Sequence, residues 1–172
     1  MIAAIVYKSQ TGSCERYAKE LSRRLHIPCY PLGSAPTRAD GELIYVGWMM
    51  AGSVVGYKKL ARKAPVAAVC AVGMAPVTEA GEAEGRAKNQ VPDSVGYFSL
   101  QGGLHLDKLP LLMKLVMKLV IRDIAAKLRE KKEKEPLSAQ EQATYQMAVR
   151  GEGEPAAWDV DRVVAWAEAR YQ

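Results

Sequence analysis

The stretch that decides the fold is Ile5-Val6-Tyr7-Lys8-Ser9-Gln10-Thr11-Gly12-Ser13-Cys14, and a helical pattern follows it at residues 15–21. An apolar run here ends in a short loop that is rich in hydroxyl groups and contains one glycine. The start of a helix offers free N–H groups and a positive partial charge, so it binds anions. The alternative to a phosphate-binding loop is an ordinary strand–turn–helix corner in which Ser and Thr act as caps. The residues predicted to bind a phosphate group are Ser9, Gln10, Thr11, Gly12, Ser13 and Cys14.

Short apolar runs alternate with helical stretches along most of the chain. A loop rich in Gly, Pro and Ser is expected at residues 33–41. Strands that alternate with helices indicate an α/β fold, a parallel sheet with helices on both faces. A phosphate loop after the first strand favours the strand order 2-1-3-4-5. The sequence predicts strands at 2–7, 27–32, 42–47, 66–73 and 94–100, and helices at 13–25, 54–63, 79–90 and 159–170.

Residues 5–21 resemble the loop that binds flavin mononucleotide (FMN) in flavodoxins. The matching positions are Ile5, Val6, Tyr7, Ser9, Gly12, Ala18 and Leu21. Cys14 stands where that family usually has Thr, and a thiol is a weak hydrogen-bond donor. The resemblance implies FMN as the cofactor and a flavodoxin-like sheet of five parallel strands.

Two further segments would border the flavin ring, because ligands of such sheets lie beyond the C-terminal ends of the strands. Residues 47–53 (Gly-Trp-Met-Met-Ala-Gly-Ser) follow the third strand and offer an aromatic ring and two thioethers as an apolar platform. Core packing explains any single one of these residues equally well. The residues expected beside the ring are Trp48, Met49, Met50, Ala51 and Gly52, with Gly73 and Met74 on the opposite edge.

The composition is that of a globular chain, with 172 residues, 49% of them apolar and 25% charged. We expect a single flavodoxin-like domain over residues 1–172. The 24 basic and 19 acidic residues leave an excess too small to indicate binding to nucleic acid. The sequence contains no uninterrupted run of about 18 apolar residues, so we expect no membrane-spanning helix.

The cysteines and histidines do not suggest metal chemistry. Cys14, Cys29 and Cys70 form no CxxC pair, and His26 and His105 are far apart in the sequence. Scattered thiols favour a reducing compartment, so we expect a cytoplasmic protein. No set of side chains typical of acid–base or nucleophilic catalysis is found, which favours chemistry carried by the cofactor.

A helical insertion at about residues 104–150 exceeds what the minimal fold requires. Residues 111–122 predict an amphipathic helix with Lys114, Lys118 and Arg122 at a spacing of four. The helix is expected to continue through a charged segment and to end before Pro136, and a second helix begins near Ser138. The apolar face of the first helix has three interpretations: core packing, pairing with a partner or a second copy (a homodimer), or peripheral contact with an anionic membrane surface, such as the inner face of a membrane.

Residues 97–122 carry a second, narrower resemblance, to the flavodoxin-type, quinone-dependent protoporphyrinogen oxidases. It implies oxidation of a tetrapyrrole precursor with a quinone as the electron acceptor. Residues 48–53 lack the Tyr of those enzymes, and the segment after the fourth strand lacks their basic residues. The expected function is an FMN-binding oxidoreductase or electron-transfer protein, with a quinone or a redox protein as its partner. The alternative is an interaction module without a cofactor that uses the 111–122 helix.

Overall fold

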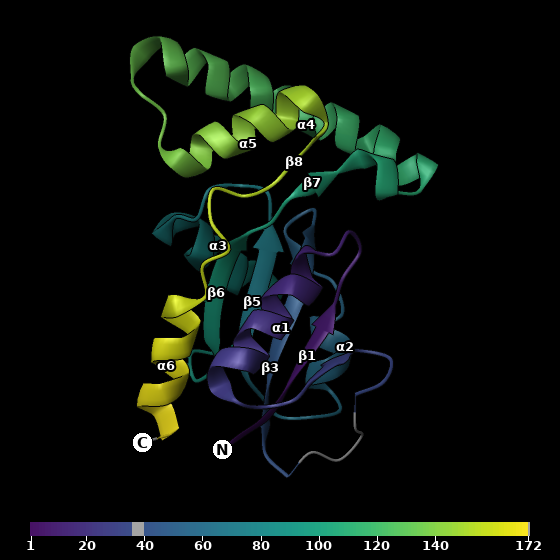
Figure 1. Ribbon diagram of the computed structural model, residues 1–172, viewed down its shortest axis with the longest axis vertical. Coiled ribbons are helices and arrows are strands. Elements are labelled where there is room, and N and C mark those ends of the chain that lie inside the picture. The colour runs from purple at the N-terminus through teal and green to yellow at the C-terminus, as the bar shows by residue number, and fades with distance from the viewer. Residues whose placement is uncertain (36–39, 172) are drawn as a thin grey trace. The chain divides into compact units, whose positions relative to one another are not determined.

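The computed structural model describes residues 1–35 and 40–171, so the predicted loop at 33–41 lies partly outside the described residues. Figure 1 shows the elements coloured along the chain. The structure contains, in order, β1 (Ile2–Lys8), α1 (Ser13–Leu25), β2 (Cys29–Pro31), β3 (Glu42–Met50), β4 (Ser53–Val54), α2 (Tyr57–Ala61), β5 (Val66–Gly73), α3 (Glu79–Asn89), β6 (Gly96–Gln101), β7 (Leu104–His105), the 3-10 helix η1 (Leu106–Lys108), α4 (Leu111–Lys134), α5 (Ala139–Arg150), β8 (Glu152–Gly153) and α6 (Asp161–Tyr171).

The chain divides into two compact units. The sheet unit comprises Met1–Val72, Thr78–Leu100 and Asp159–Gln172. The helical unit comprises Gly73–Val77 and Gln101–Trp158, and it contains the predicted insertion.

The parallel sheet follows the order β2-β1-β3-β5-β6, and β4 pairs with β3 off this path. Ile5 of β1 lies opposite Cys29 of β2 on one side and Ile44 of β3 on the other. Counted along the path alone, this is the order 2-1-3-4-5 that the sequence predicts. The α/β class and its flavodoxin-like strand order are therefore confirmed. Strand β5 is buried from Val66 to Val72, as a central strand covered on both faces must be.

Helices cover both faces of this sheet. In Figure 1, α1 and α6 lie on one side of the sheet, and α2 and α3 lie on the other. Helix α1 turns an apolar face to the sheet because its buried residues recur at helical spacing. These are Cys14, Tyr17, Ala18 and Leu21. The core on the opposite face includes Val6, Leu43, Tyr45, Tyr57, Val69 and Tyr97.

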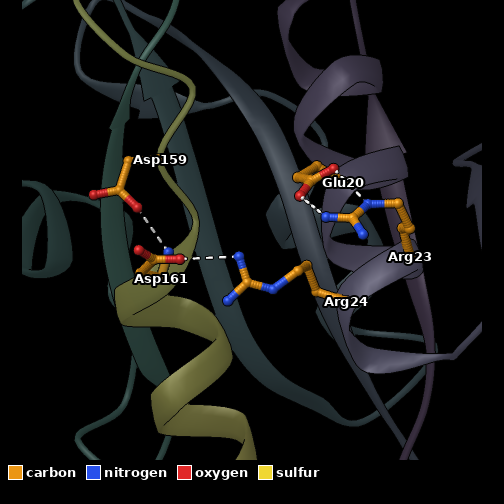
Figure 2. A network of polar contacts seen from close by, with 5 residues as sticks. All are labelled: Glu20, Arg23, Arg24, Asp159 and Asp161. Atoms are coloured by element: carbon orange, nitrogen blue, oxygen red, sulfur yellow. Dashed lines mark hydrogen bonds and ion pairs between the residues drawn. The ribbon is translucent and has the colours of Figure 1, made fainter.

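Polar contacts fix the end of α1 near the start of α6 (Figure 2). Arg24 donates from Nη1 to Asp161 Oδ1 at 3.0 Å, which joins the two helices. The backbone N–H of Asp161 donates to Asp159 Oδ1 at 2.8 Å, in the manner of a helix cap. Glu20 and Arg23 form a separate pair along α1 at 2.6 Å. These contacts are exposed, so they orient the helices more than they stabilise the fold.

The elements whose lengths differ most from the predicted ones are β3, α2 and β2. Strand β3 runs on to Met50 instead of ending at residue 47, because Met49 and Met50 pair with the antiparallel strand β4. That pairing takes Val54 out of the predicted helix at 54–63, and α2 is short, from Tyr57 to Ala61. Strand β2 is also shorter than the predicted strand at 27–32.

In the helical unit, α4 and α5 follow the sequence pattern closely. Helix α4 continues through the charged segment and ends at Lys134, before Pro136. Ser138 and Glu141 form the predicted capping box, with reciprocal bonds of 3.2 and 2.9 Å between each side chain and the other residue's backbone N–H. The apolar cluster of this unit includes Leu104, Leu106, Ile121, Met147 and Ala148. Among the described residues, none of the helices has both the length and the apolarity that crossing a membrane requires.

Candidate functional site

The loop between β1 and α1 is open above its glycine. Gly12 has φ +107°, a conformation that residues with a side chain rarely adopt. A Cβ atom added to Gly12 would meet no atom within 4 Å among the described residues, so crowding does not explain the glycine. The Gly12 N–H donates to Ser9 Oγ at 3.1 Å. The hydroxyl of Ser9 accepts this bond and keeps its own proton for another acceptor.

Helix α1 begins directly after Gly12, and within the described residues it has no side-chain cap. The Arg16 N–H donates to the Gly12 carbonyl at 3.0 Å, which is the first bond of the helical ladder. The first turn is therefore a helix N-terminus of the kind that binds anions. The carboxylate of Glu15 lies in this turn, but it forms an ion pair with Lys19 at 2.6 Å, which reduces its repulsion toward an anion.

Cys14 contributes differently from the Thr that the flavodoxin resemblance would place there. Its side chain is buried, and burial raises the pKa of the thiol to about 12. The thiol is therefore neutral at pH 7, which excludes a thiolate in the loop. What Cys14 offers an anion is its backbone N–H group.

Trp48 brings an unpaired hydrogen-bond donor to the same end of the sheet. Gly47 lies opposite Lys8, the last residue of β1, so Trp48 stands level with the start of the loop. Strand alternation puts Trp48 on the face of Ile44 and Val46, the face opposite the core of Leu43 and Tyr45. Its Nε1 atom is buried and has no hydrogen-bond partner among residues 1–35 and 40–171. Buried donors almost always have a partner, so a further acceptor at this position would be stabilising.

The segment predicted to border the flavin ring is a tight hairpin rather than an open loop. Ala51 and Gly52 have φ values of +48° and +79°, as in the two-residue turns that suit twisted strands. Met49 packs against the core on the far face from α1, whereas Met50 is half exposed. Trp48 and Met50 therefore lie on the same face of the sheet as α1, and Met49 lies on the opposite face.

Asn89 holds this hairpin in place, and the sequence analysis missed it. Its side chain is 2% exposed. Asn89 Oδ1 accepts from the Val54 N–H at 2.7 Å, and Nδ2 donates to the carbonyls of Gly52 and Gly85 at 2.9 and 2.8 Å. An Asn in the last turn of a predicted surface helix was the one available signal, and it did not show which backbone the amide would reach.

Gly73 and Met74 belong to the helical unit. The Gly73 carbonyl accepts from the Gly102 N–H at 2.8 Å, and the Met74 carbonyl accepts from Thr144 Oγ1 at 2.7 Å. The Met74 side chain packs against the apolar cluster of that unit. The structure thus places both the loop residues Ser9–Cys14 and Trp48–Gly52 in the sheet unit, and it assigns Gly73 and Met74 to the other unit.

An open pocket of about 690 Å³ adjoins the loop between β1 and α1 and shares Ser9 with it. Its lining includes Lys8, Lys59 and Lys63, one acidic residue, Glu15, and apolar residues such as Leu60. Three lysines against one glutamate give the lining a positive balance, which attracts anions. Sequence reasoning missed Lys59 and Lys63, although their spacing of four residues was a visible signal.

Taken together, the site can bind and orient an anionic ligand. It combines an uncapped helix start, hydroxyl groups, an indole donor and a pocket lined by three lysines, and its one thiol is held neutral. The chain matches no protein-family model, and a search of curated proteins finds no match.

Proposed function

We propose that this chain binds FMN at the β1–α1 loop and works as a flavodoxin-like redox protein. One observation carries the proposal: the open, uncapped start of α1 stands at the same end of the sheet as the unpaired indole donor of Trp48. An anionic ligand with further acceptor atoms would satisfy both groups at once. These residues fit FMN, because the loop suits a phosphate and the indole suits a second acceptor.

Each residue of the site has a distinct task in this proposal. The backbone N–H groups at the start of α1 would hold the phosphate, and the hydroxyls of Ser9 and Thr11 would add donors. Lys8 would supply positive charge from the pocket lining. Trp48 would orient the ligand through Nε1. FMN, when bound, supplies the electron-transfer or hydride-transfer chemistry.

Two features favour an oxidoreductase over a one-electron carrier. The carriers that this fold resembles are acidic, whereas this chain has a net charge of +5. The helical insertion also adds a second compact unit that a carrier does not need. Turnover of a quinone with an organic donor would support an enzyme. Reduction by a flavoprotein reductase without such turnover would support a carrier.

The first test is a visible spectrum of the purified protein, followed by titration with FMN and with riboflavin, which lacks the phosphate. We expect FMN to bind at least about tenfold more tightly, because a charged hydrogen bond contributes roughly 1.5–3 kcal/mol. Gly12→Asp should reduce FMN affinity to the level of riboflavin. Gly12→Ala imposes the same backbone strain without the charge and is the matched control. A colourless protein that takes up no FMN, or equal affinity for the two flavins, would refute the proposal.

Trp48→Phe tests the indole donor separately. This change removes Nε1 and keeps an aromatic ring. FMN affinity should fall roughly five- to tenfold, as for one lost hydrogen bond. Stability of the protein without flavin should stay the same or rise, because the change deletes a buried donor that has no partner. A loss of stability with unchanged affinity would assign Nε1 to the fold instead.

An interaction module without a cofactor is the second candidate. The observation that favours it is the apolar surface of α4, where Leu111, Leu112 and Leu119 are each at least 70% exposed. If a protein unable to bind FMN still associates with a partner or a membrane through this surface, that result would support this candidate. Its surface is also the basis of the inference below.

A further inference from the structure

The first turns of α4 expose a row of large aliphatic side chains. Their exposed fractions run from 44% for Val120 to 76% for Leu112. The residues follow the spacing i, i+1, i+4, i+5, i+8, i+9, so they share one face of the helix. This aliphatic patch consists of Leu111, Leu112, Leu115, Val116, Leu119 and Val120.

The patch is not the face through which α4 packs in its own unit. Ile121 is buried, and Met117 and Ile124 are partly buried against the cluster that contains Met147 and Ala148. Helix α4 is therefore already anchored through its other face. A contiguous apolar surface that serves no internal packing indicates a binding surface.

A basic row runs beside the patch. Lys114, Lys118 and Arg122 recur at a spacing of four, and the sequence from Leu111 to Arg122 contains no acidic residue. The second half of α4 differs, because pairs such as Asp123–Lys127 at 2.7 Å and Glu130–Lys134 at 2.6 Å balance its charge. Apolar surface and uncompensated positive charge thus coincide in the first half of the helix.

We propose that the aliphatic patch docks on an anionic phospholipid surface, with α4 lying in the plane of the interface. The aliphatic side chains would enter the acyl boundary, while Lys114, Lys118 and Arg122 would reach the headgroups. A second copy of this chain suits the patch less well, because it would bring a second basic row against the first. A protein partner also fits less well, since the patch lacks the Tyr and Trp that anchor most such interfaces. This docking goes beyond the proposed redox function and does not depend on it.

The test is co-sedimentation of the full chain with two kinds of vesicle, phosphatidylcholine alone and phosphatidylcholine mixed with phosphatidylglycerol. We expect binding to the mixed vesicles that weakens with added salt, and little binding to the neutral ones. We expect a large loss of binding in the triple variant Lys114→Gln, Lys118→Gln and Arg122→Gln. Its partition coefficient between vesicles and solution should fall on the order of a hundredfold, because each basic residue near an anionic surface contributes roughly a fivefold factor.

The matched control for charge is the combined variant Lys58→Gln, Arg62→Gln and Lys88→Gln, which removes the same charge from exposed positions of the sheet unit outside the candidate site. It should change vesicle binding only a few-fold. An equal loss in this control would assign the attraction to net charge and overturn the role of α4.

The apolar contribution is tested with two side chains of similar exposure, Leu115 at 53% and Val149 at 57%. Leu115→Ser should weaken vesicle binding severalfold, whereas Val149→Ser on α5 should not. Both side chains are exposed, so both variants should keep the wild-type circular dichroism spectrum.

Three results would overturn the proposal. The first is no binding to vesicles, and the second is equal binding to neutral and anionic vesicles. The third is a dimer in light scattering that Leu115→Ser dissociates, in a protein that does not bind vesicles. The last result would assign the patch to a second copy. FMN titration of the same samples separates the two proposals, since vesicle binding by a flavin-free protein would leave this one standing.

Discussion

Helices α1 and α4 look alike in the sequence, and the structure uses them differently. Both carry apolar residues at helical spacing. The 13-residue helix α1 buries Cys14, Tyr17, Ala18 and Leu21 against the sheet. The 24-residue helix α4 has Ile121 as its buried residue among those described, and it leaves the aliphatic patch exposed. Periodicity identifies an apolar face, but it does not show whether that face meets protein, lipid or solvent.

The cause lies in what each helix has to pack against. Helix α1 lies on a parallel sheet whose central strand is buried from Val66 to Val72. Helix α4 meets a smaller apolar cluster. The helical unit also relies on a buried polar network in which Gln101 Nε2 donates to the Gln140 carbonyl at 2.8 Å and to Thr144 Oγ1 at 3.0 Å. The helical unit is thus held by a smaller apolar cluster together with this buried network.

The comparison of the two helices predicts its largest effect for Leu21→Ala. Leu21 is a fully buried residue of α1, so the change should lower the free energy of unfolding by about 2–5 kcal/mol. Leu119→Ala is the matched control in α4, where the side chain is 70% exposed and the effect should stay within about 0.5 kcal/mol. Urea denaturation measures both. Equal losses would mean that the aliphatic patch is covered by protein.

Thr144→Val should have the next largest effect, because it breaks the polar network of the helical unit. The change keeps the shape of a fully buried side chain and removes the hydroxyl that donates to the Met74 carbonyl at 2.7 Å. Leaving this part-buried carbonyl without its donor should cost roughly 1–3 kcal/mol.

Thermal unfolding of Thr144→Val and Thr144→Ser separates the hydroxyl from the methyl group. The Ser variant retains the hydrogen bond, and its unfolding temperature should lie closer to wild type. A Val variant as stable as wild type would show that the network contributes little.

The smallest predicted effect is a pH dependence at the start of α5. The hydrogen bond from Lys131 and the bond from the Ser138 backbone N–H lower the pKa of Glu141 below its ordinary value of 4.5. A lowered pKa in the folded state means that this stabilisation is present above pH 4.5 and is lost as the pH falls through the folded pKa. Glu141→Gln should therefore lose stability at pH 7 and little at pH 3.

Urea denaturation of wild type and of Glu141→Gln at both pH values measures this dependence. Glu133→Gln, at an exposed position of α4, removes the same charge outside the capping box and should change stability little at either pH. If the free energy of unfolding depends on pH in the same way in wild type and in Glu141→Gln, the pH dependence does not come from Glu141.

Local signals were sufficient for much of this molecule. Helix α1 occupies the predicted residues 13–25, because its apolar spacing and the preceding glycine both specify where it starts. The capping box of Ser138 and Glu141 was also predicted, since four consecutive residues contain it. The hairpin turn at Ala51 and Gly52 was not, because it depends on the pairing of Met49 with Val54 and on the amide of Asn89.

The candidate site shows the same limit. The loop residues from Ser9 to Cys14 could be proposed from their order alone, since a strand, a hydroxyl-rich turn and a helix are local features. Other features depend on burial and on segments distant in the sequence. These are the unpaired donor of Trp48, the neutral thiol of Cys14 and the pocket lining with Lys59 and Lys63.

The sequence by itself determined the alternation of strands and helices, and with it the order of the parallel sheet, because spacing, caps and turn residues act within a few positions. Only the tertiary structure decided which apolar face stays exposed, which amide holds the hairpin and which indole lacks a partner. Burial and hydrogen-bond pairing are properties of all the segments that meet at a point, so no single stretch of the chain contains them.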